Sequence, residues 1–290
     1  MRKIRNRLFV TLLSLIVVLS MSATAFASGG EYLCLGADLK AEELATVLEL
    51  LGVQDINDYD VTYITNADEK NYLGSYVSAA QIGSQALSSV LISETGGSRI
   101  DVETYNIGYC TQDMYRNALA TAGVSGAKVK VAGPVEISGT AALVGTIKVY
   151  EKMTGEPVSD EVIETCVDEL TTTGDIGEEL GDKEGVSALI AELKEQLANN
   201  PNMSESELEE AIRSAAEKLG LSLSEQNIQK VKSLLQKLQN SDIDWDNVKK
   251  QSGNILKGLK DRIGDIDIDK EEAKGIFAQL IDWIKGLINK

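Results

Sequence analysis

Residues 32–65 read YLCLGADLKAEELATVLELLGVQDINDYDVTYIT, and this stretch sets the expected fold class. Tyr32–Gly36 and Asp60–Thr65 are short segments rich in apolar, β-branched and aromatic residues, a composition typical of strands. Between them, apolar residues recur three and four positions apart and predict a helix over 40–51, for which Asp38 can supply the N-cap. The stretch therefore predicts one strand–helix–strand unit.

A later stretch repeats this pattern. Arg99–Asn106 predicts a strand, Thr111–Ala122 a helix capped by its first residue, and Lys128–Ala132 another strand. Both helices are followed by Gly-Val, at Gly52-Val53 and Gly123-Val124, and glycine favours the backbone conformation that ends a helix. The repetition favours an internal duplication.

Three further elements are expected in this part of the chain. Asn66-Ala-Asp-Glu69 resembles a capping box and begins a helix toward Tyr76. Gln85–Ser93 and the strand over 99–106 are typical of a hairpin around the glycine-rich turn at 95–98. A helix of small residues over Gly139–Tyr150 follows, in which Ala141 and Gly145 allow a sheet or helix to approach closely.

The composition changes near residue 155. All nine tyrosines lie between Tyr32 and Tyr150, whereas both tryptophans lie beyond. The later part predicts helices only, with capping boxes at Ser204–Glu207 and Ser222–Glu225 and short connections that favour a bundle. These helices are expected near 159–171, 184–198, 205–219, 224–239, 245–261 and 270–288. We therefore expect a mixed α/β domain over 28–155, with two strand–helix–strand units and a hairpin, followed by an all-α domain over 156–290.

Residues 1–27 are typical of a secretory signal peptide. Four basic residues precede the apolar run Leu8–Ser20, and Ala25-Phe26-Ala27 offers the small side chains that signal peptidase requires. We expect cleavage after Ala27 and an extracytoplasmic mature protein. The alternative is an uncleaved anchor, since residues 8–27 are long enough to span a bilayer.

The net charge of the chain limits the kinds of partner it can bind. The 28 basic and 45 acidic residues give a formal net charge of −17. The predicted signal peptide holds four of the basic residues and none of the acidic ones, so the mature chain of 263 residues has 24 basic and 45 acidic residues, a net charge of −21. Nucleic acid repels such a chain, and we expect no nucleic-acid partner. The acidity fits a cation-binding protein as one alternative.

Several chemistries have no support in the sequence. No histidine occurs, which excludes Ser-His-Asp and Cys-His catalysis and imidazole zinc sites. No phosphate-binding glycine loop is present either, and we expect no cofactor. The three cysteines are Cys34, Cys110 and Cys166; the first two fall in one predicted domain and can pair, and the alternative is that all three are small buried side chains.

Two runs of alternating aspartates resemble calcium-binding loops. They are Asp242, Asp244 and Asp246, and Asp265, Asp267 and Asp269. Neither has the glycine and glutamate that an EF-hand loop needs at its sixth and twelfth positions. Helix capping fits better, with Asp244 as an N-cap between the apolar Ile243 and Val248. The weak candidates for a metal site are Asp265, Asp267 and Asp269.

One polar and aromatic group is a candidate ligand cleft, with a solvated helix face as the alternative. Its members are Asn66, Asp68, Glu69, Tyr72 and Gln81. Because carboxylates are abundant, a hydrolase that uses only Asp and Glu is an alternative function. Ser125-Gly-Ala-Lys128 matches the Ser-x-x-Lys pattern of penicillin-recognising enzymes, but it leads into a strand instead of beginning a helix, so we expect no nucleophile there and name no catalytic residue.

The last predicted helix is strongly amphipathic. Its apolar stripe suits a membrane surface or a protein partner, and docking onto the preceding helices is the alternative. The residues proposed for this contact are Phe277, Leu280, Trp283, Ile284 and Leu287.

Four segments resemble the YpuA-like exported proteins of Gram-positive bacteria, a family of unknown function. They are Leu35-Gly36-Ala37-Asp38-Leu39, Tyr72-Leu73-Gly74-x-Tyr76, Ala80-Gln81-Ile82-Gly83-Ser84 and Ser138-Gly139-Thr140-Ala141-Ala142-Leu143. The later Asp242-Ile-Asp244-Trp245 also fits this family. The resemblance implies an extracytoplasmic protein and brings no activity with it. We expect a non-enzymatic binding or structural module of the cell envelope, whose partner is the cell wall, a membrane surface or an envelope protein.

Overall fold

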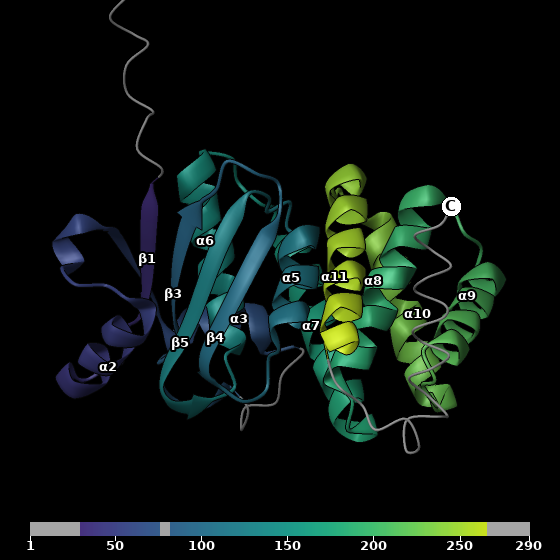
Figure 1. The fold of residues 1–290 in the computed structure, drawn as a ribbon, viewed down its shortest axis with the longest axis horizontal. Coiled ribbons are helices and arrows are strands. Elements are labelled where there is room, and N and C mark those ends of the chain that lie inside the picture. The colour runs from purple at the N-terminus through teal and green to yellow at the C-terminus, as the bar shows by residue number, and fades with distance from the viewer. Residues whose placement is uncertain (1–29, 76–81, 266–290) are drawn as a thin grey trace, which may run out of the picture. The chain divides into compact units, whose positions relative to one another are not determined.

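The computed structural model describes residues 30–75 and 82–265, and these residues contain one mixed five-stranded sheet. The order across the sheet is β2-β1-β3-β5-β4 (Figure 1). The strands are β1 (Glu31–Gly36), β2 (Asp60–Ile64), β3 (Ser89–Glu94), β4 (Ile100–Ile107) and β5 (Ala127–Ile137). A mixed sheet with helices, followed by helices alone, confirms the expected fold class.

The helices around the sheet are α2 (Ala41–Leu51), α3 (Asn66–Leu73), α5 (Gln112–Thr121) and α6 (Thr140–Thr154), with a short 3₁₀ helix at Ile56–Asp58. The helices that follow are α7 (Asp160–Leu180), α8 (Lys183–Asn199), α9 (Glu205–Lys218), α10 (Glu225–Asn240) and α11 (Trp245–Asp265). None of the helices in the described ranges is both long and apolar enough to cross a bilayer.

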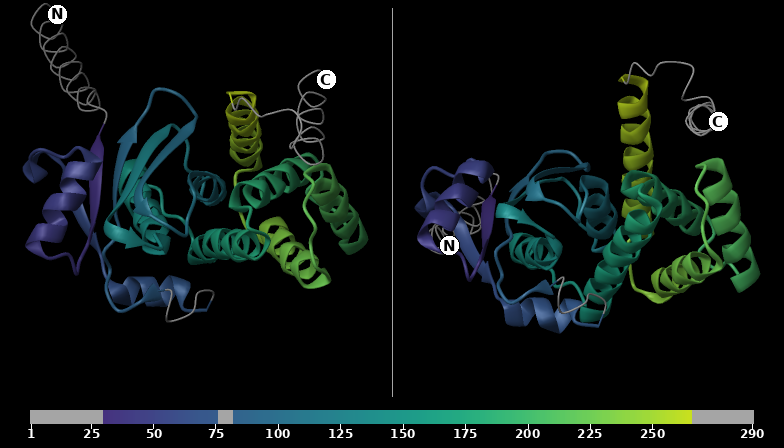
Figure 2. Two further views of the ribbon diagram at one scale, coloured as in Figure 1. Left: turned by 60° about the horizontal axis from the view of Figure 1, so that its bottom comes forward. Right: turned by 90° about the horizontal axis from the view of Figure 1, so that it is seen from below.

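Both predicted strand–helix–strand units are present. β1 pairs with β2 in parallel around α2, and β4 pairs with β5 in parallel around α5. Both crossovers step toward the β2 edge, yet α2 packs on one face of the sheet while α5 and α6 pack on the other (Figure 2). The two units therefore have opposite hands, although right-handed crossovers are by far the commoner. This difference argues against the expected duplication of one unit.

The predicted hairpin over 85–106 is wrong. β3 and β4 do not pair with each other, because β5 lies between them, antiparallel to β3 and parallel to β4. The turn at 95–98 instead meets the start of β5, where Thr95 N donates to Gly126 O at 2.6 Å. β5 takes the central place because Val129 and Val131 are fully buried against the helices on one face and Ala132 is fully buried under α2 on the other.

Each face of the sheet has its own apolar core. Leu33 and Leu35 of β1 pack with Val47 and Leu51 of α2, and all four are almost completely buried. Burial of such a side chain contributes about 1.5–3 kcal/mol. On the other face, α6 approaches β1 closely, since a Cβ on Gly145 would lie 3.2 Å from Cys34 Sγ. The close approach predicted from the small residues of this helix is confirmed.

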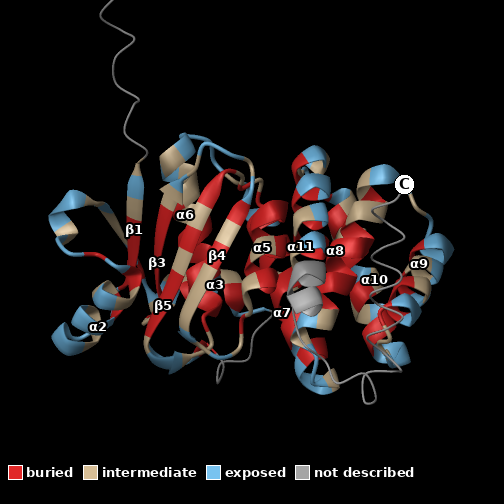
Figure 3. Ribbon diagram, viewed as in Figure 1, coloured by how far each residue is buried: buried red, intermediate tan, exposed pale blue. Residues whose placement is uncertain are grey.

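The helical part begins with a longer helix than expected. α7 was predicted to end at residue 171, but it continues to Leu180 through Gly174 and Gly177. A Cβ on Gly174 would lie 2.4 Å from the ring of Tyr109, so glycine there lets the segment after β4 pack directly on α7. α8 lies in the middle of this part, and every residue from Val186 to Lys194 is buried (Figure 3).

Three predicted caps are corrected and three are confirmed, one of them Thr111, whose Oγ1 accepts from Met114 N at the start of α5. Asp38 does not cap α2, since its Oδ2 accepts a hydrogen bond from Ala86 N. Thr65 begins α3 with Asp68 as its reciprocal partner, one residue before the predicted box. Ser224, not Ser222, caps α10. The Ser204–Glu207 box and the Asp244 cap are present as expected.

The helical part packs directly against the sheet part. α5 contacts α7, α8 and α11. At the β4 edge, Gln251 of α11 accepts from Ile100 N at 3.3 Å and donates to Ser98 O. The division into two domains near residue 155 stays a prediction, and the predicted signal peptide and the helix over 270–288 lie outside the described residues.

Candidate functional site

A pocket of about 250 Å³ lies beyond the carboxyl ends of the parallel strands. β1, β2, β4 and β5 all run toward this end of the sheet, and the antiparallel β3 starts from it. Open sheets of this kind bind ligands outside the carboxyl ends of their strands. We call this cavity the Glu69 pocket; its lining residues are Glu69, Ile82, Gly83, Ser84, Gln85, Leu87, Ser88, Ile137, Ser138, Gly139 and Ala141.

Glu69 is the one ionisable side chain among these lining residues. It stands in α3, is 3% exposed, and its Oε2 accepts a hydrogen bond from Asn66 Nδ2 at 2.9 Å. Burial raises the pKa of the Glu69 carboxyl to about 7, the bond from Asn66 opposes the shift, and the negative charge of Asp38 adds to it. Near neutral pH this carboxyl therefore exchanges between a proton donor and an anion.

The remaining polar groups of the pocket are hydroxyls, one amide and backbone. Ser88 is 3% exposed, and no hydrogen bond joins its hydroxyl to any residue in the described ranges. Ser138 Oγ lies 3.4 Å from Thr140 Oγ1 at the start of α6. Gly139 is the N-cap of α6, its φ of 87° is readily adopted by glycine, and no described side chain caps the first turn of the helix.

The wall formed by residues 82–88 is fixed to the end of β1. Asp38 Oδ2 accepts from Ala86 N at 2.8 Å, and Gly36 N donates to Ser89 Oγ at 3.1 Å. A Cβ on Gly36 would lie 2.3 Å from Ala86 O, so glycine is required where the two segments cross. The Glu69 pocket is therefore held by backbone contacts as well as by side chains.

The structure brings together part of the predicted cleft. Asn66 donates to Glu69 but is not itself among the lining residues, whereas Asp68 pairs with Lys148 at 3.0 Å. Tyr72 points elsewhere, because its hydroxyl donates to Asp160 Oδ1 at 3.2 Å at the start of α7. Gln81 lies outside the described residues. Sequence reasoning missed Ser88 and Ser138, since serines beside turns are ordinarily solvated.

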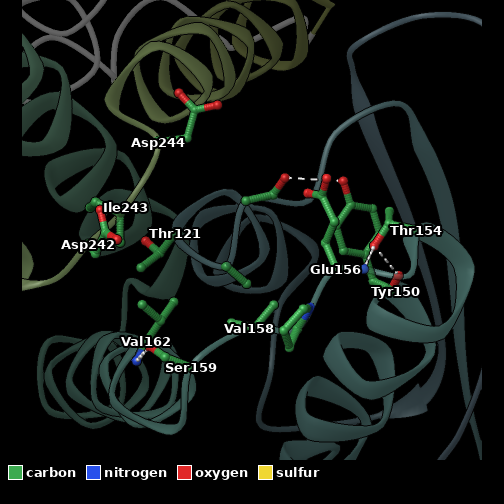
Figure 4. Close-up of a pocket in the computed structure, with 13 residues that line it drawn as sticks. Thr121, Tyr150, Thr154, Glu156, Val158, Ser159, Val162, Asp242, Ile243 and Asp244 are labelled. Carbon is green, nitrogen blue, oxygen red and sulfur yellow. Dashed lines mark hydrogen bonds between the residues drawn. The ribbon is translucent and has the colours of Figure 1, made fainter.

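A second cavity of about 330 Å³ lies where the ends of α5 and α6 meet the start of α7 and residues 242–244 (Figure 4). Three exposed carboxylates border it, from Glu156, Asp242 and Asp244. Asp244 Oδ1 accepts from Asp246 N and Asn247 N, both at 3.0 Å, and so serves as the cap of α11. These acids are solvated at the rim and do not form a built ligand site.

Metal and thiol chemistry find no site in the described ranges. No group of three or more Cys, Asp and Glu residues there is placed to hold a metal ion. The candidates Asp267 and Asp269 lie outside the described residues, and nothing is described of the Asp265 side chain. The three cysteines are buried and unpaired, so the pairing of Cys34 with Cys110 is not formed. Burial raises the pKa of Cys110 to about 12, which keeps it a thiol.

A buried ionic network was not predicted from the sequence. Lys194 of α8 and Glu169 of α7 are both completely buried and form an ion pair at 2.8 Å. Lys194 Nζ also donates to Asn117 O at 2.7 Å and to Thr121 Oγ1 at 2.8 Å. All three protons of the ammonium group are thus used, and the network ties α5, α7 and α8 together.

Comparison with known proteins identifies the family of this chain. The family model described as "Protein of unknown function (DUF1002)" matches residues 35–255. The chain belongs to this DUF1002 family. It is also 39% identical to "Uncharacterized protein YpuA" of Bacillus subtilis (strain 168), over 292 residues that cover 100% of this chain and 98% of that relative. No solved structure matches. The resemblance to YpuA-like proteins is confirmed.

In this DUF1002 chain, three of the four segments that carry the resemblance meet at the Glu69 pocket. Residues 82–84 and 138–141 supply lining residues. Residues 35–39 lie beneath them and hold Ala86 through Gly36 and Asp38. The fourth segment begins at Tyr72 of α3, three residues after Glu69. We therefore take this pocket as the candidate functional site.

Proposed function

We propose that this DUF1002 protein is an exported binding protein of the cell envelope that holds a small polar ligand in the Glu69 pocket. The observation that carries the proposal is a buried carboxyl, fixed by Asn66, that lines a cavity at the carboxyl edge of the sheet. Binding sites typically combine a concave surface with a few convergent polar groups. The signal-peptide pattern supports the extracytoplasmic location.

The geometry favours binding over hydrolysis. Hydrolysis by carboxylates alone needs two carboxyl groups on the same cavity, about 5–9.5 Å apart. Only Glu69 among the lining residues carries one, because Asp38 and Asp68 are engaged with Ala86 N and Lys148. The hydrolase alternative therefore lacks its second group at this pocket.

The test uses the mature protein, beginning at Ser28, and soluble cell-wall fragments. We expect the fragments to shift the backbone amide NMR signals of Ser84, Ser88, Ser138 and Ala141 in a saturable manner. Ser84→Trp, at an exposed position on the rim, should block the pocket and abolish these shifts. The matched control Ser206→Trp, exposed on α9, should leave them unchanged.

Shifts that are absent from the wild type, or that survive Ser84→Trp, would contradict the pocket as the binding site. Export is tested separately, by N-terminal sequencing of the protein recovered from the envelope fraction and the medium. A chain that still begins at Met1 in the cytoplasm would contradict the proposed location.

A further inference from the structure

We propose that the Glu69 pocket binds the carboxylate of its ligand at the first turn of α6 and takes up one proton as it does so. This inference rests on the proposed function, because it names the chemical class that the same pocket holds. It follows from three features of the pocket. Hydrogen-bond donors lie at the start of α6, neither lysine nor arginine is among the described lining residues, and Glu69 is the one acidic residue among them.

The first turn of α6 offers hydrogen-bond donors to the pocket. Gly139 and Ala141 both line the cavity, and the N–H groups of an initial turn point out of the helix end. No described side chain caps this turn, and Gly139 O is occupied by Ala142 N and by the Tyr115 hydroxyl. Such a turn carries a partial positive charge and favours an anion.

Ser88 supplies an independent sign that a ligand group belongs here. Its side chain is 3% exposed in the wall of the pocket, and its hydroxyl has no hydrogen-bond partner in the described ranges. This hydroxyl can therefore donate to a ligand oxygen without breaking a bond to another described residue. Ser138 offers a second hydroxyl beside the helix start.

No cation is available to neutralise an anion in the cavity, since neither lysine nor arginine is among the lining residues. The charged groups that act on Glu69 are Asp38, from the loop after β1, and Asp68 and Lys70 of α3. Lys148 of α6 is engaged with Asp68. Because Asp68 and Lys148 offset each other, Asp38 and Lys70 remain as opposing charges among the described residues, and the main obstacle to a second negative charge is its direct repulsion by an ionised Glu69 in a buried site.

Protonation of Glu69 removes the repulsion between its carboxylate and the ligand anion. When Glu69 binds one proton, its carboxyl becomes neutral and can donate a hydrogen bond to the ligand carboxylate. One ligand anion, one ionised Glu69 and one proton from the buffer form one complex: an O–H bond forms on Glu69, the proton's bond to the buffer breaks, and no other covalent bond changes. Burial raises the pKa of Glu69 to about 7, so the uptake falls within the physiological range.

The test is calorimetry on the mature protein with N-acetylalanine and glucuronate as carboxylate probes and ethylammonium as the cationic probe. Each is titrated between pH 5.5 and 8.5, in two buffers that differ in ionisation enthalpy. We expect carboxylate affinity to be level below pH 7, to fall about tenfold per pH unit above it, and to take up close to one proton at pH 8. The relative affinities distinguish a peptide end from an acidic sugar.

Two variants sharpen the result. Glu69→Gln keeps a donor without a titration, so it should bind carboxylate at every pH about as well as the wild type does at pH 6. Ser88→Ala should weaken binding roughly 2- to 10-fold, as expected for one neutral hydrogen bond. The control Glu94→Gln, exposed at the end of β3, should reproduce the wild-type pH profile.

Binding of ethylammonium that strengthens as pH rises and is lost in Glu69→Gln would overturn the inference, while the pocket would remain a binding site. Failure of both carboxylates at pH 6 would also overturn it, and wall fragments that still shift the pocket signals would then leave the proposed function standing. Folding of each variant is checked by its melting temperature.

Discussion

Replacement of Lys194 by methionine should destabilise the protein strongly. The substitution preserves much of the side-chain volume but removes the ammonium group that donates to Asn117 O, Thr121 Oγ1 and Glu169 Oε1. Glu169 is completely buried and would keep only the hydrogen bond from Thr121 Oγ1, at 2.6 Å. Breaking one side of a buried ion pair costs about 3–5 kcal/mol.

The free energy of unfolding is measured by urea titration, followed by circular dichroism. With a slope of roughly 2–3 kcal/mol per molar urea for a chain of this size, the midpoint should fall by about 1–2.5 M. The control Arg213→Met removes a surface ion pair with Glu209 and Glu225, and the midpoint should move far less.

The double variant Lys194→Met/Glu169→Leu tests the reason for the loss. It removes both charges, and Thr121 Oγ1 can still donate to Asn117 O, 3.4 Å away. We expect most of the lost stability to return, because apolar replacements of buried ion pairs are often neutral or stabilising. A loss below about 1 kcal/mol in Lys194→Met, or no recovery in the double variant, would refute the reasoning.

Three further predictions concern stability. Asn227→Leu should raise the free energy of unfolding by about 1–2 kcal/mol in urea, because both amide atoms of this fully buried side chain lack partners among the described residues; a loss would show that a bound water satisfies them. Gly174→Ala should cost about 1–3 kcal/mol through its clash with the Tyr109 ring, and an unchanged melting temperature would mean that the ring moves aside freely. The folded-state pKa of Glu69, about 7, lies above its ordinary 4.5, so its contribution is complete below pH 4.5 and is lost as pH rises through 7. Wild type should therefore lose up to about 3 kcal/mol relative to Glu69→Gln over that interval, and parallel pH profiles would contradict this assignment.

The elements that follow from local patterns were predictable. Apolar spacing and caps located α2, α5 and most helices after residue 155 to within a few residues. The partner of β3 was not predictable in this way, because the turn at 95–98 favours a local hairpin whereas burial of Val129 and Val131 selects β5. A pairing that closes a loop of more than thirty residues leaves no mark in the local sequence.

The same limit applies to the pocket. The density of polar residues in α3 pointed to Asn66 and Glu69, but only the fold shows that Tyr72 turns away toward α7. Lys194 lies between acidic residues in the sequence and resembles a solvated helix position. It is buried because α8 is surrounded by other helices, a property of the tertiary arrangement and not of the helix itself.

The place of β5 between β3 and β4 has a kinetic consequence. β3 and β4 are neighbours in sequence and leave the ribosome before β5, so for a time β3 has β1 as its one available partner and β4 has none of its final partners. The two strands can then form a transient local hairpin that must open before β5 inserts, and sheets built from distant segments fold slowly. The export proposed for this chain would require it to cross a membrane unfolded, and slow completion of the sheet would favour that state.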